Sequence, residues 1–168
     1  MKNKNNFLKT ALGVFLMTTA FTFANNTDPL EMKESPSELN KEYIKVVHEN
    51  SAQDEAKFLS GIISEYDVRS SEGFDSSIDD KFMVVFKSNK GYARVAYDNK
   101  GRIINVKKYL KNVSTPNDIS DYVSENYEGW KIVDNKYKET YDIGGDVEKS
   151  YVLTLNQGKE KKKIRVKG

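Results

Sequence analysis

The chain has 168 residues, of which 27 are basic and 25 acidic, with a formal charge of +2 and no cysteine. This length accommodates one ordinary domain or two small units that share a core. The absence of cysteine excludes disulfides, thiolate nucleophiles, thiolate metal ligands and lipid attachment at a lipobox cysteine. Folding must therefore rely on buried apolar and aromatic side chains, which 10 Tyr, 8 Phe and 1 Trp can supply.

The N-terminus has the layout of a secretory signal peptide. Lys2, Lys4 and Lys9 precede an apolar run over 11–24, which ends in the small residues of a cleavage site. The run is short for a membrane span, so we predict a signal peptide over 1–24, cleaved near Ala24, with no stable membrane anchor afterwards. An uncleaved anchor is the alternative. Cleavage of the signal peptide predicts a periplasmic or secreted protein.

Removal of the signal peptide changes the charge of the protein. Loss of its three lysines takes the formal charge from +2 to −1. The apparent basicity belongs to the signal peptide, and the sequence therefore predicts no nucleic-acid partner.

The segment after the signal peptide is polar, contains two prolines and lacks apolar periodicity, which predicts a linker over 25–41. The next nine residues, EYIKVVHEN (42–50), are predicted as a short strand. The following segment, SAQDEAKFLSGII (51–63), is predicted as a short helix with three small or apolar residues on one face, Ala52, Ala56 and Leu59.

Beyond Ile62 the apolar residues alternate, which predicts an antiparallel meander. Three strands are expected to place one face on the core, with Phe82, Val84 and Phe86, then Ala93, Val95 and Tyr97, then Ile104, Val106 and Leu110. The segments 88–91 and 98–101 begin with Ser or Asp and end with Gly, the signature of a type I turn with a glycine bulge. A calcium loop requires carboxylates at alternate positions, and only Asp98 is available.

The segment TPNDISDYVSENYEGW (115–130) predicts a helix. Thr115 is the expected N-cap, Pro116 the first helical residue, Asp118 the capping-box acid and Gly129 the C-terminal stop. Helical spacing relates Ile119, Tyr122, Val123 and Tyr127. The rest of the chain predicts a further strand and then a closing hairpin that turns near Gly158.

An internal repeat is also predicted. Residues 82–101 can be laid on 151–168, matching Phe82 with Tyr151, Phe86 with Leu155 and Val95 with Ile164. This predicts one domain over 42–168 with two repeat units, 42–113 and 114–168. Chance matching of alternating strands is the alternative.

We find no set of residues suited to catalysis or metal binding. His48 is the single histidine, which leaves no partner for a zinc site and favours a surface or packing role. The pair Gly144–Gly145 is explained by a hairpin turn, and no nucleophile elbow is present. The sequence predicts that the protein is not an enzyme and has no cofactor or metal site.

Two features remain as candidates for binding. Tyr and Trp side chains whose polar end is exposed to solvent are typical of binding faces, although strands also favour aromatics. The candidate partner-binding residues are Tyr92, Tyr109, Trp130, Tyr137 and Tyr141. The run KEKKKIRVK places Lys161, Lys163, Arg165 and Lys167 on one strand face, either as lysines that protect an edge strand or as an anion-binding surface.

The order of the elements carries a family resemblance. The elements come in this order: an aromatic–Val–aromatic strand, a hairpin, the segment YDNKGRI, a helix that starts at proline and ends in YEGW, the strand YVLTL, and a hairpin that turns at glycine. Over residues 59–168 this resembles the PepSY-like, β-lactamase-inhibitor-like (BLIP-like) domains of exported Bacteroidota proteins. Members usually have Leu-Pro at the helix start and Tyr-Pro-Gly at its end, where this chain has Thr115-Pro116 and Tyr127-Glu128-Gly129.

The resemblance implies an α+β fold, with an antiparallel sheet and a helix packed across it, in two PepSY-like/BLIP-like units. It also implies a non-catalytic role in binding or restraining other proteins, peptidases among them. The inhibitory hairpin and disulfides of the true inhibitors have no counterpart here, so no site residue is carried over. We therefore predict an exported binding module that engages or inhibits a protein partner. The alternative is a small-ligand carrier with a pocket between sheet and helix, lined by Trp130 and Tyr122.

Overall fold

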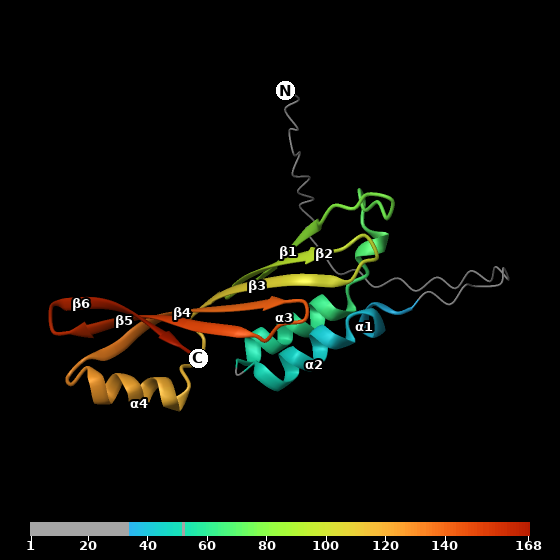
Figure 1. Cartoon of the computed structure of the whole chain (residues 1–168). Coiled ribbons are helices and arrows are strands. Elements are labelled where there is room, and N and C mark those ends of the chain that lie inside the picture. Colours follow the sequence, from blue (N-terminus) through green and yellow to red (C-terminus); the bar gives the residue numbers. More distant parts are fainter. Residues whose placement is uncertain (1–33, 52) are drawn as a thin grey trace, which may run out of the picture.

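The computed structural model describes residues 34–51 and 53–168 and shows an α+β fold, in which helices cover one side of a six-stranded antiparallel sheet (Figure 1). The strands lie in chain order and are β1 (Phe82–Ser88), β2 (Gly91–Tyr97), β3 (Ile103–Lys111), β4 (Lys131–Asp142), β5 (Glu148–Gln157) and β6 (Glu160–Lys167). The helices are α1 (Pro36–Leu39), α2 (Lys41–Asn50), α3 (Asp54–Glu65), the 3-10 turn η1 (Val68–Ser70) and α4 (Asn117–Asn126). The predicted α+β class and antiparallel meander are confirmed. Within the described ranges, no helix has the length and apolar character that crossing a membrane requires.

The predicted signal peptide (1–24) and the first part of the predicted linker (25–33) lie outside the described residues. The remainder of the linker segment contains α1, which is capped by Ser35 through a hydrogen bond from the Glu38 amide (3.2 Å). Asn40 is buried, and its Oδ1 accepts a hydrogen bond from the Ile103 amide at 2.8 Å. This contact ties the start of α2 to the start of β3.

The prediction of a strand at 42–50 is wrong, because these residues form α2. Tyr43 and Val47, four residues apart, are its buried positions, with exposed fractions of 1% and 2%. The β-branched residues of this segment favour a strand locally, but packing of the Tyr43–Val47 stripe against the core selects the helix. The predicted helix at 51–63 is confirmed as α3, although Ala52 lies outside the described residues.

The core lies between the helices and one face of the sheet. Val84, Val95, Val106 and Tyr141 are directly paired across β1 to β4 and form one buried row of this face. The predicted core faces of β1 and β2 are confirmed, since their alternate residues belong to the core cluster.

The predicted core position at Ile104 is wrong. The pairing of β2 with β3 shifts by one residue at this point, so that Tyr97 pairs with Ile103 and Ala96 with Asn105. This irregularity makes Ile103 the buried residue, with 2% of its surface exposed, and removes Ile104 from the core face.

Both predicted hairpin turns are present. The Gly101 amide donates to the Asp98 carbonyl at 3.0 Å, the Lys100 amide donates to Asp98 Oδ1 at 2.9 Å, and Gly101 has a φ of 85°. A positive φ at this position is what a glycine bulge requires. In the first turn Ser88 pairs directly with Gly91.

The helix α4 begins later than predicted. Pro116 occupies the N-cap position, and Thr115 instead accepts a hydrogen bond from Asn135 Nδ2 at 3.2 Å. Ile119 and Val123 are the buried residues of the helix, whereas Tyr122 is 41% exposed. The predicted closing hairpin is confirmed as β5 and β6.

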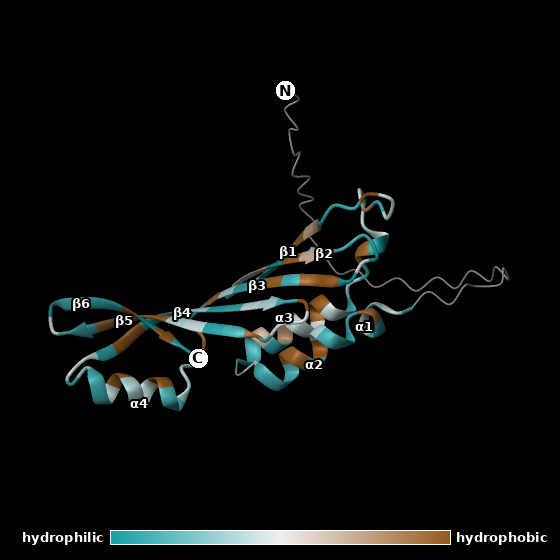
Figure 2. Ribbon diagram, in the orientation of Figure 1, coloured by the Kyte–Doolittle hydropathy of each residue, from teal (hydrophilic) through white to brown (hydrophobic). Residues whose placement is uncertain are grey.

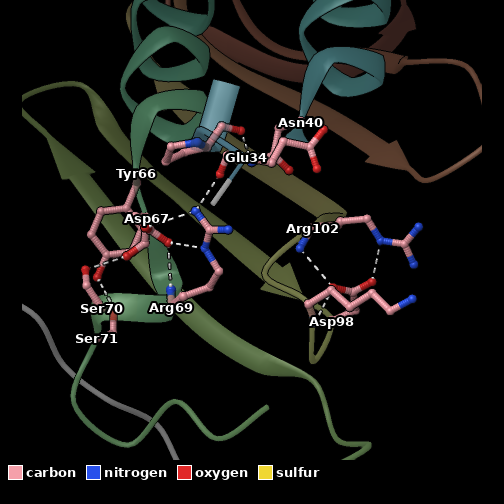
Figure 3. A network of polar contacts seen from close by, with 11 residues as sticks. Glu34, Asn40, Tyr66, Asp67, Arg69, Ser70, Ser71, Asp98 and Arg102 are labelled. Atoms are coloured by element: carbon pink, nitrogen blue, oxygen red, sulfur yellow. Dashed lines mark hydrogen bonds and ion pairs between the residues drawn. The ribbon is translucent and has the colours of Figure 1, made fainter. Parts of the chain in front are cut away.

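Polar contacts close the end of the sheet near α1 and η1 (Figure 3). Arg69 Nε donates to Asp67 Oδ1 at 2.7 Å, and its Nη2 donates to the Glu34 carbonyl at 2.9 Å. On the neighbouring turn, Arg102 Nε donates to Asp98 Oδ2 at 2.7 Å. The contacts of Arg69 tie η1 to the segment before α1, and the contact of Arg102 with Asp98 closes the turn between β2 and β3 on itself.

Candidate functional site

The sheet face that points away from the helices is the candidate functional site, and we call it the open face. The helices α1 to α4 all lie on the other side of the sheet (Figure 1). One row of the open face runs straight across the six strands through directly paired residues, Lys87, Tyr92, Tyr109, Lys138, Ser150 and Lys167. Tertiary structure therefore gathers one surface from residues that span half of the chain.

Two of the predicted binding residues meet at the centre of this face. Tyr92 and Tyr109 are directly paired across β2 and β3, and their ring centroids lie 5.2 Å apart with an interplanar angle of 30°. Arg94 Cζ lies 5.4 Å from the centroid of the Tyr92 ring, on the same strand face. Both tyrosines are half-buried, so each presents part of its ring to solvent. Such a pair is a preorganised contact area, because packing restricts the rotamers of its members.

Exposed basic side chains lie on the open face of every strand except β5. They are Lys87, Arg94, Lys107, Lys111, Lys131, Lys136, Lys138, Lys161, Lys163, Arg165 and Lys167. None of them forms an ion pair with another residue of the described chain. The acidic side chains of the same strand faces are Asp134, Asp142 and Glu148.

Two like-charge pairs lie directly opposite each other on this face. Arg94 pairs with Lys107 across β2 and β3, and Lys111 pairs with Lys136 across β3 and β4. Like charges in directly opposed positions destabilise a sheet. The open face therefore carries an electrostatic cost in the free protein.

The structure contradicts the prediction that Tyr137 and Tyr141 contact a partner. Both lie on the helix-covered face of β4, and each has 1% of its surface exposed. In the sequence KYKETY the two tyrosines alternate with Lys136 and Lys138, so they point to the other face of the strand. If the lysines face solvent, this alternation predicts that the tyrosines are buried. Their rings pack in the core against Tyr151 and Tyr43, respectively.

The fifth predicted binding residue, Trp130, lies apart from the open face. It follows α4 and is partly buried against the core. Lys162 on β6 lies over the rings of both Tyr127 and Trp130, with Nζ 4.9 Å and 6.0 Å from their centroids. The structure thus brings together two of the five predicted residues, Tyr92 and Tyr109.

A buried polar network, which the sequence analysis missed, lies on the opposite face of the sheet. Lys108 on β3 and Glu139 on β4 are directly paired and form an ion pair whose side chains are 0% and 2% exposed. Lys108 also donates to Ser60 on α3. Glu139 Oε2 accepts hydrogen bonds from Tyr137 (2.6 Å) and Ser51 (2.7 Å).

The environment shifts the pKa values of this network. Burial lowers the pKa of Lys108, although the charge of Glu139 opposes that shift. Burial alone raises the pKa of Glu139, but the charge of Lys108 and the donors on Lys108, Tyr137 and Ser51 outweigh it and hold the pKa below its ordinary value. The pair is sealed from solvent, so we assign it to the docking of α3 on the sheet rather than to chemistry on a substrate.

A small cleft of about 180 Å³ lies between α2 and α3 and is lined by Ile44, Val47, His48, Lys57, Ser60, Gly61, Ser64 and Glu65. It does not involve Trp130 or Tyr122, the residues predicted to line a ligand pocket. His48 is exposed at its rim, as a surface histidine.

Comparison of the chain with protein-family models, with curated proteins and with solved structures gave no match.

Proposed function

We propose that this protein is a non-catalytic binding module whose open face engages a protein partner in the periplasm or outside the cell. The observation that carries the proposal is the Tyr92–Tyr109 pair on a sheet face that no described helix covers. The other tyrosines of the sheet, Tyr97, Tyr137, Tyr141 and Tyr151, are buried in the core. Partly exposed, preorganised aromatics with a charged surround are the usual centre of a protein interface.

The proposed site of action rests on the signal peptide predicted over 1–24. The two-unit organisation and the PepSY-like, BLIP-like resemblance are part of the same proposal. In support, a helical segment precedes a three-stranded meander twice in the chain, as α2 and α3 before β1 to β3 and as α4 before β4 to β6. Inhibition of an envelope peptidase or another enzyme is one form that the binding can take.

The alternative of a small-ligand carrier has less support. It requires a pocket between sheet and helix, whereas the cleft described above lies between the two helices α2 and α3. Its volume of about 180 Å³ is also below the roughly 300 Å³ at which ligand pockets usually begin.

Site-specific photo-crosslinking in the producing cells tests the proposal. A photoreactive phenylalanine analogue is placed at Arg94 or Lys138 on the open face, and at Lys45 or Lys57 on α2 and α3 as controls. All four positions are exposed and lose the same charge. We expect covalent adducts with a protein from the open-face positions and none from the controls.

A second variant separates the tyrosine pair from the rest of the face. Tyr92→Ala/Tyr109→Ala is expected to lower the yield of adducts at Lys138 about tenfold or more, because hot-spot aromatics dominate interface energies. Tyr122→Ala is the matched control, since Tyr122 is exposed on α4. Adducts from the helix positions alone would overturn the assignment of the face, and absence of adducts at all four positions would count against a protein partner.

A further inference from the structure

The open face carries more charge than a soluble sheet needs, and the excess is not confined to an edge. Lysines on an edge strand protect it from pairing with other chains, which accounts for the basic residues of β6. It does not account for Lys107 and Lys111 on β3 or for Lys136 and Lys138 on β4, because both strands lie inside the sheet. These positions have no role in edge protection.

The cross-strand pairs strengthen this point. Arg94 opposite Lys107 and Lys111 opposite Lys136 repel each other without an ion-pair partner among the described residues. Residues that lower stability and make no compensating contact within the fold are typical of functional surfaces. An anionic partner neutralises these charges and removes the repulsion. Binding then regains the free energy that the repulsion costs the free protein.

The strand β5 differs from its neighbours in a way that suggests where the anion lies. From Ser150 to Asn156 its open-face side chains are neutral and half-buried, namely Ser150, Val152, Thr154 and Asn156, whereas Glu148 at its first position is acidic and exposed. Each is paired with an open-face residue on both sides. Val152, for example, lies between Lys136 on β4 and Arg165 on β6, and Ser150 lies between Lys138 and Lys167. Ser150, Val152 and Asn156 are therefore bordered by lysine or arginine on both sides, whereas Thr154 lies between Asp134 on β4 and Lys163 on β6.

We infer that the partner is acidic and that an extended acidic segment of it lies over β5, between the basic side chains of β4 and β6. The inference rests on the proposed function and specifies the chemistry of its partner. Alternate side chains of an extended peptide repeat every ~6.6 Å, the same period as the open-face residues along a strand. Acidic residues at every second position therefore match the basic residues on either side of Ser150, Val152 and Asn156, which are two strand spacings, ~9.6 Å, apart. Beside Thr154 the match is with Lys163 on β6 alone, because Asp134 occupies the β4 position.

An acidic peptide suits the surface better than the other polyanions do. Single-stranded nucleic acid binds by stacking bases on free aromatic faces, whereas no aromatic lies in the β5 row and Tyr92 and Tyr109 pack on each other. A membrane surface selects basic faces with exposed apolar side chains that insert. Of the large exposed apolar side chains in the described residues, Phe58, Ile62 and Tyr122 lie on helices α3 and α4, Ile78 and Ile143 lie in loops, and Val133 alone lies on a strand, at the irregularity of β4.

Titration of the purified protein with a fluorescent peptide tests the inference by anisotropy. The peptide alternates Glu and Thr over the 10 residues that match the length of β5, and a Gln–Thr peptide of the same length is the neutral control. We expect binding of the acidic peptide that weakens steeply with salt, because exposed charges are screened beyond the Debye length. Equal binding of the two peptides would overturn the inference.

Two sets of variants locate the peptide. Lys136→Glu/Arg165→Glu is expected to weaken binding by about tenfold or more, whereas Lys45→Glu/Lys57→Glu, with the same change of charge on the helices, leaves it unchanged.

Val152→Glu places a carboxylate between Lys136 and Arg165 and thereby mimics the bound acid. Relative to the neutral Val152→Gln, it is expected to raise the thermal midpoint and to weaken peptide binding about tenfold. A Val152→Glu protein that binds as well as Val152→Gln would place the peptide elsewhere and overturn the inference.

Further outcomes separate this inference from the proposed function. Preferential binding of a single-stranded oligonucleotide or of phosphatidylglycerol vesicles over the acidic peptide would overturn it, as would salt-sensitive self-association in sedimentation. Photo-crosslinks from Arg94 and Lys138 without a preference for the acidic peptide would leave the binding module standing and reject only the acidic partner. Loss of those crosslinks would reject the binding module itself.

Discussion

At the scale of the residue, Glu139 shows how one buried side chain organises its surroundings. It accepts hydrogen bonds from Lys108, Tyr137 and Ser51, which come from β3, from β4 itself and from the segment between α2 and α3. An ionised pair inside a core is costly to desolvate, and removal of one partner leaves the other charge uncompensated. The pair therefore ties the helices to a single position on the sheet.

Replacement of Glu139 by Gln is expected to lower the free energy of unfolding by about 3–5 kcal/mol, because Lys108 then remains buried without its counter-ion. In the unmodified protein the pKa of Glu139 is lowered on folding, so its contribution is present above the ordinary value of 4.5 and is lost as the pH falls through the folded value. The lowered pKa of Lys108 makes stability rise with pH only between its value in the folded protein and its ordinary value of 10.5. Urea unfolding from about pH 3 to about pH 7 should show a weaker acid dependence for Glu139→Gln.

The exposed Glu148 on the open face provides the control. Glu148→Gln is expected to change the free energy of unfolding by less than about 0.5 kcal/mol. An equally small effect at Glu139 would contradict the assigned role of the pair. If Glu139→Gln fails to fold, Lys108→Met/Glu139→Gln removes the uncompensated charge and is expected to restore folding.

At the scale of the element, the register of β2 against β3 depends on close approach at Gly91. A Cβ atom at this position would lie 1.9 Å from the Tyr109 carbonyl oxygen. Because Gly91 has no side chain, the first residue after the β1–β2 turn can pair directly with Leu110 on β3. The same register aligns Tyr92 with Tyr109 on the open face.

The substitution Gly91→Ala is therefore expected to destabilise the protein by about 1–3 kcal/mol, because the backbone of β3 must move away. Gly158→Asn is the matched control in another hairpin, where φ is 59° and a Cβ meets nothing within 4 Å, and Asn tolerates this conformation. Thermal unfolding of both variants measures the difference. Equal midpoints for the two variants would contradict the importance of this approach.

At the scale of the whole molecule, charge is divided between two sides. Within the described residues, eleven exposed basic side chains lie on the open face, whereas on the other side α4 carries Asp118, Asp121 and Glu125 and no basic residue, and α2 and α3 carry residues of both signs. Figure 2 shows hydrophilic residues along β6 and much of α4, on opposite sides of the second half of the fold. A nearly neutral chain therefore presents a strongly basic surface, and net charge is a poor guide to its partners.

Salt is expected to raise the thermal midpoint of the protein by screening the repulsion across the open face. Lys107→Glu converts its contact with Arg94 from repulsion to attraction, which is worth about 0.5–1 kcal/mol at low ionic strength. This variant should be more stable than the original protein at low salt and should respond less to added salt. Lys57→Glu on α3 is the control, and an identical salt response in all three proteins would contradict the cost assigned to the open face.

The sequence by itself determined the strands from β1 onward, the turn at Asp98 and the apolar residues of α4. In these segments local chemistry and the final structure agree, because alternation, turn residues and helical spacing act over short distances. The identity of α2 required tertiary packing, since its β-branched residues favour a strand until Tyr43 and Val47 meet the core. The shift at Ile104 likewise follows from pairing with a neighbouring strand.

The candidate site was only partly accessible from the sequence. Tyr92 and Tyr109 were identified as candidates, but their contact, the burial of Tyr137 and Tyr141, and the pairing of Lys108 with Glu139 depend on strand register and on which face the helices cover. The convergence of basic residues from separate strands onto one surface has the same origin. Composition averages charge over the chain, and only the tertiary structure decides which charges face a partner together.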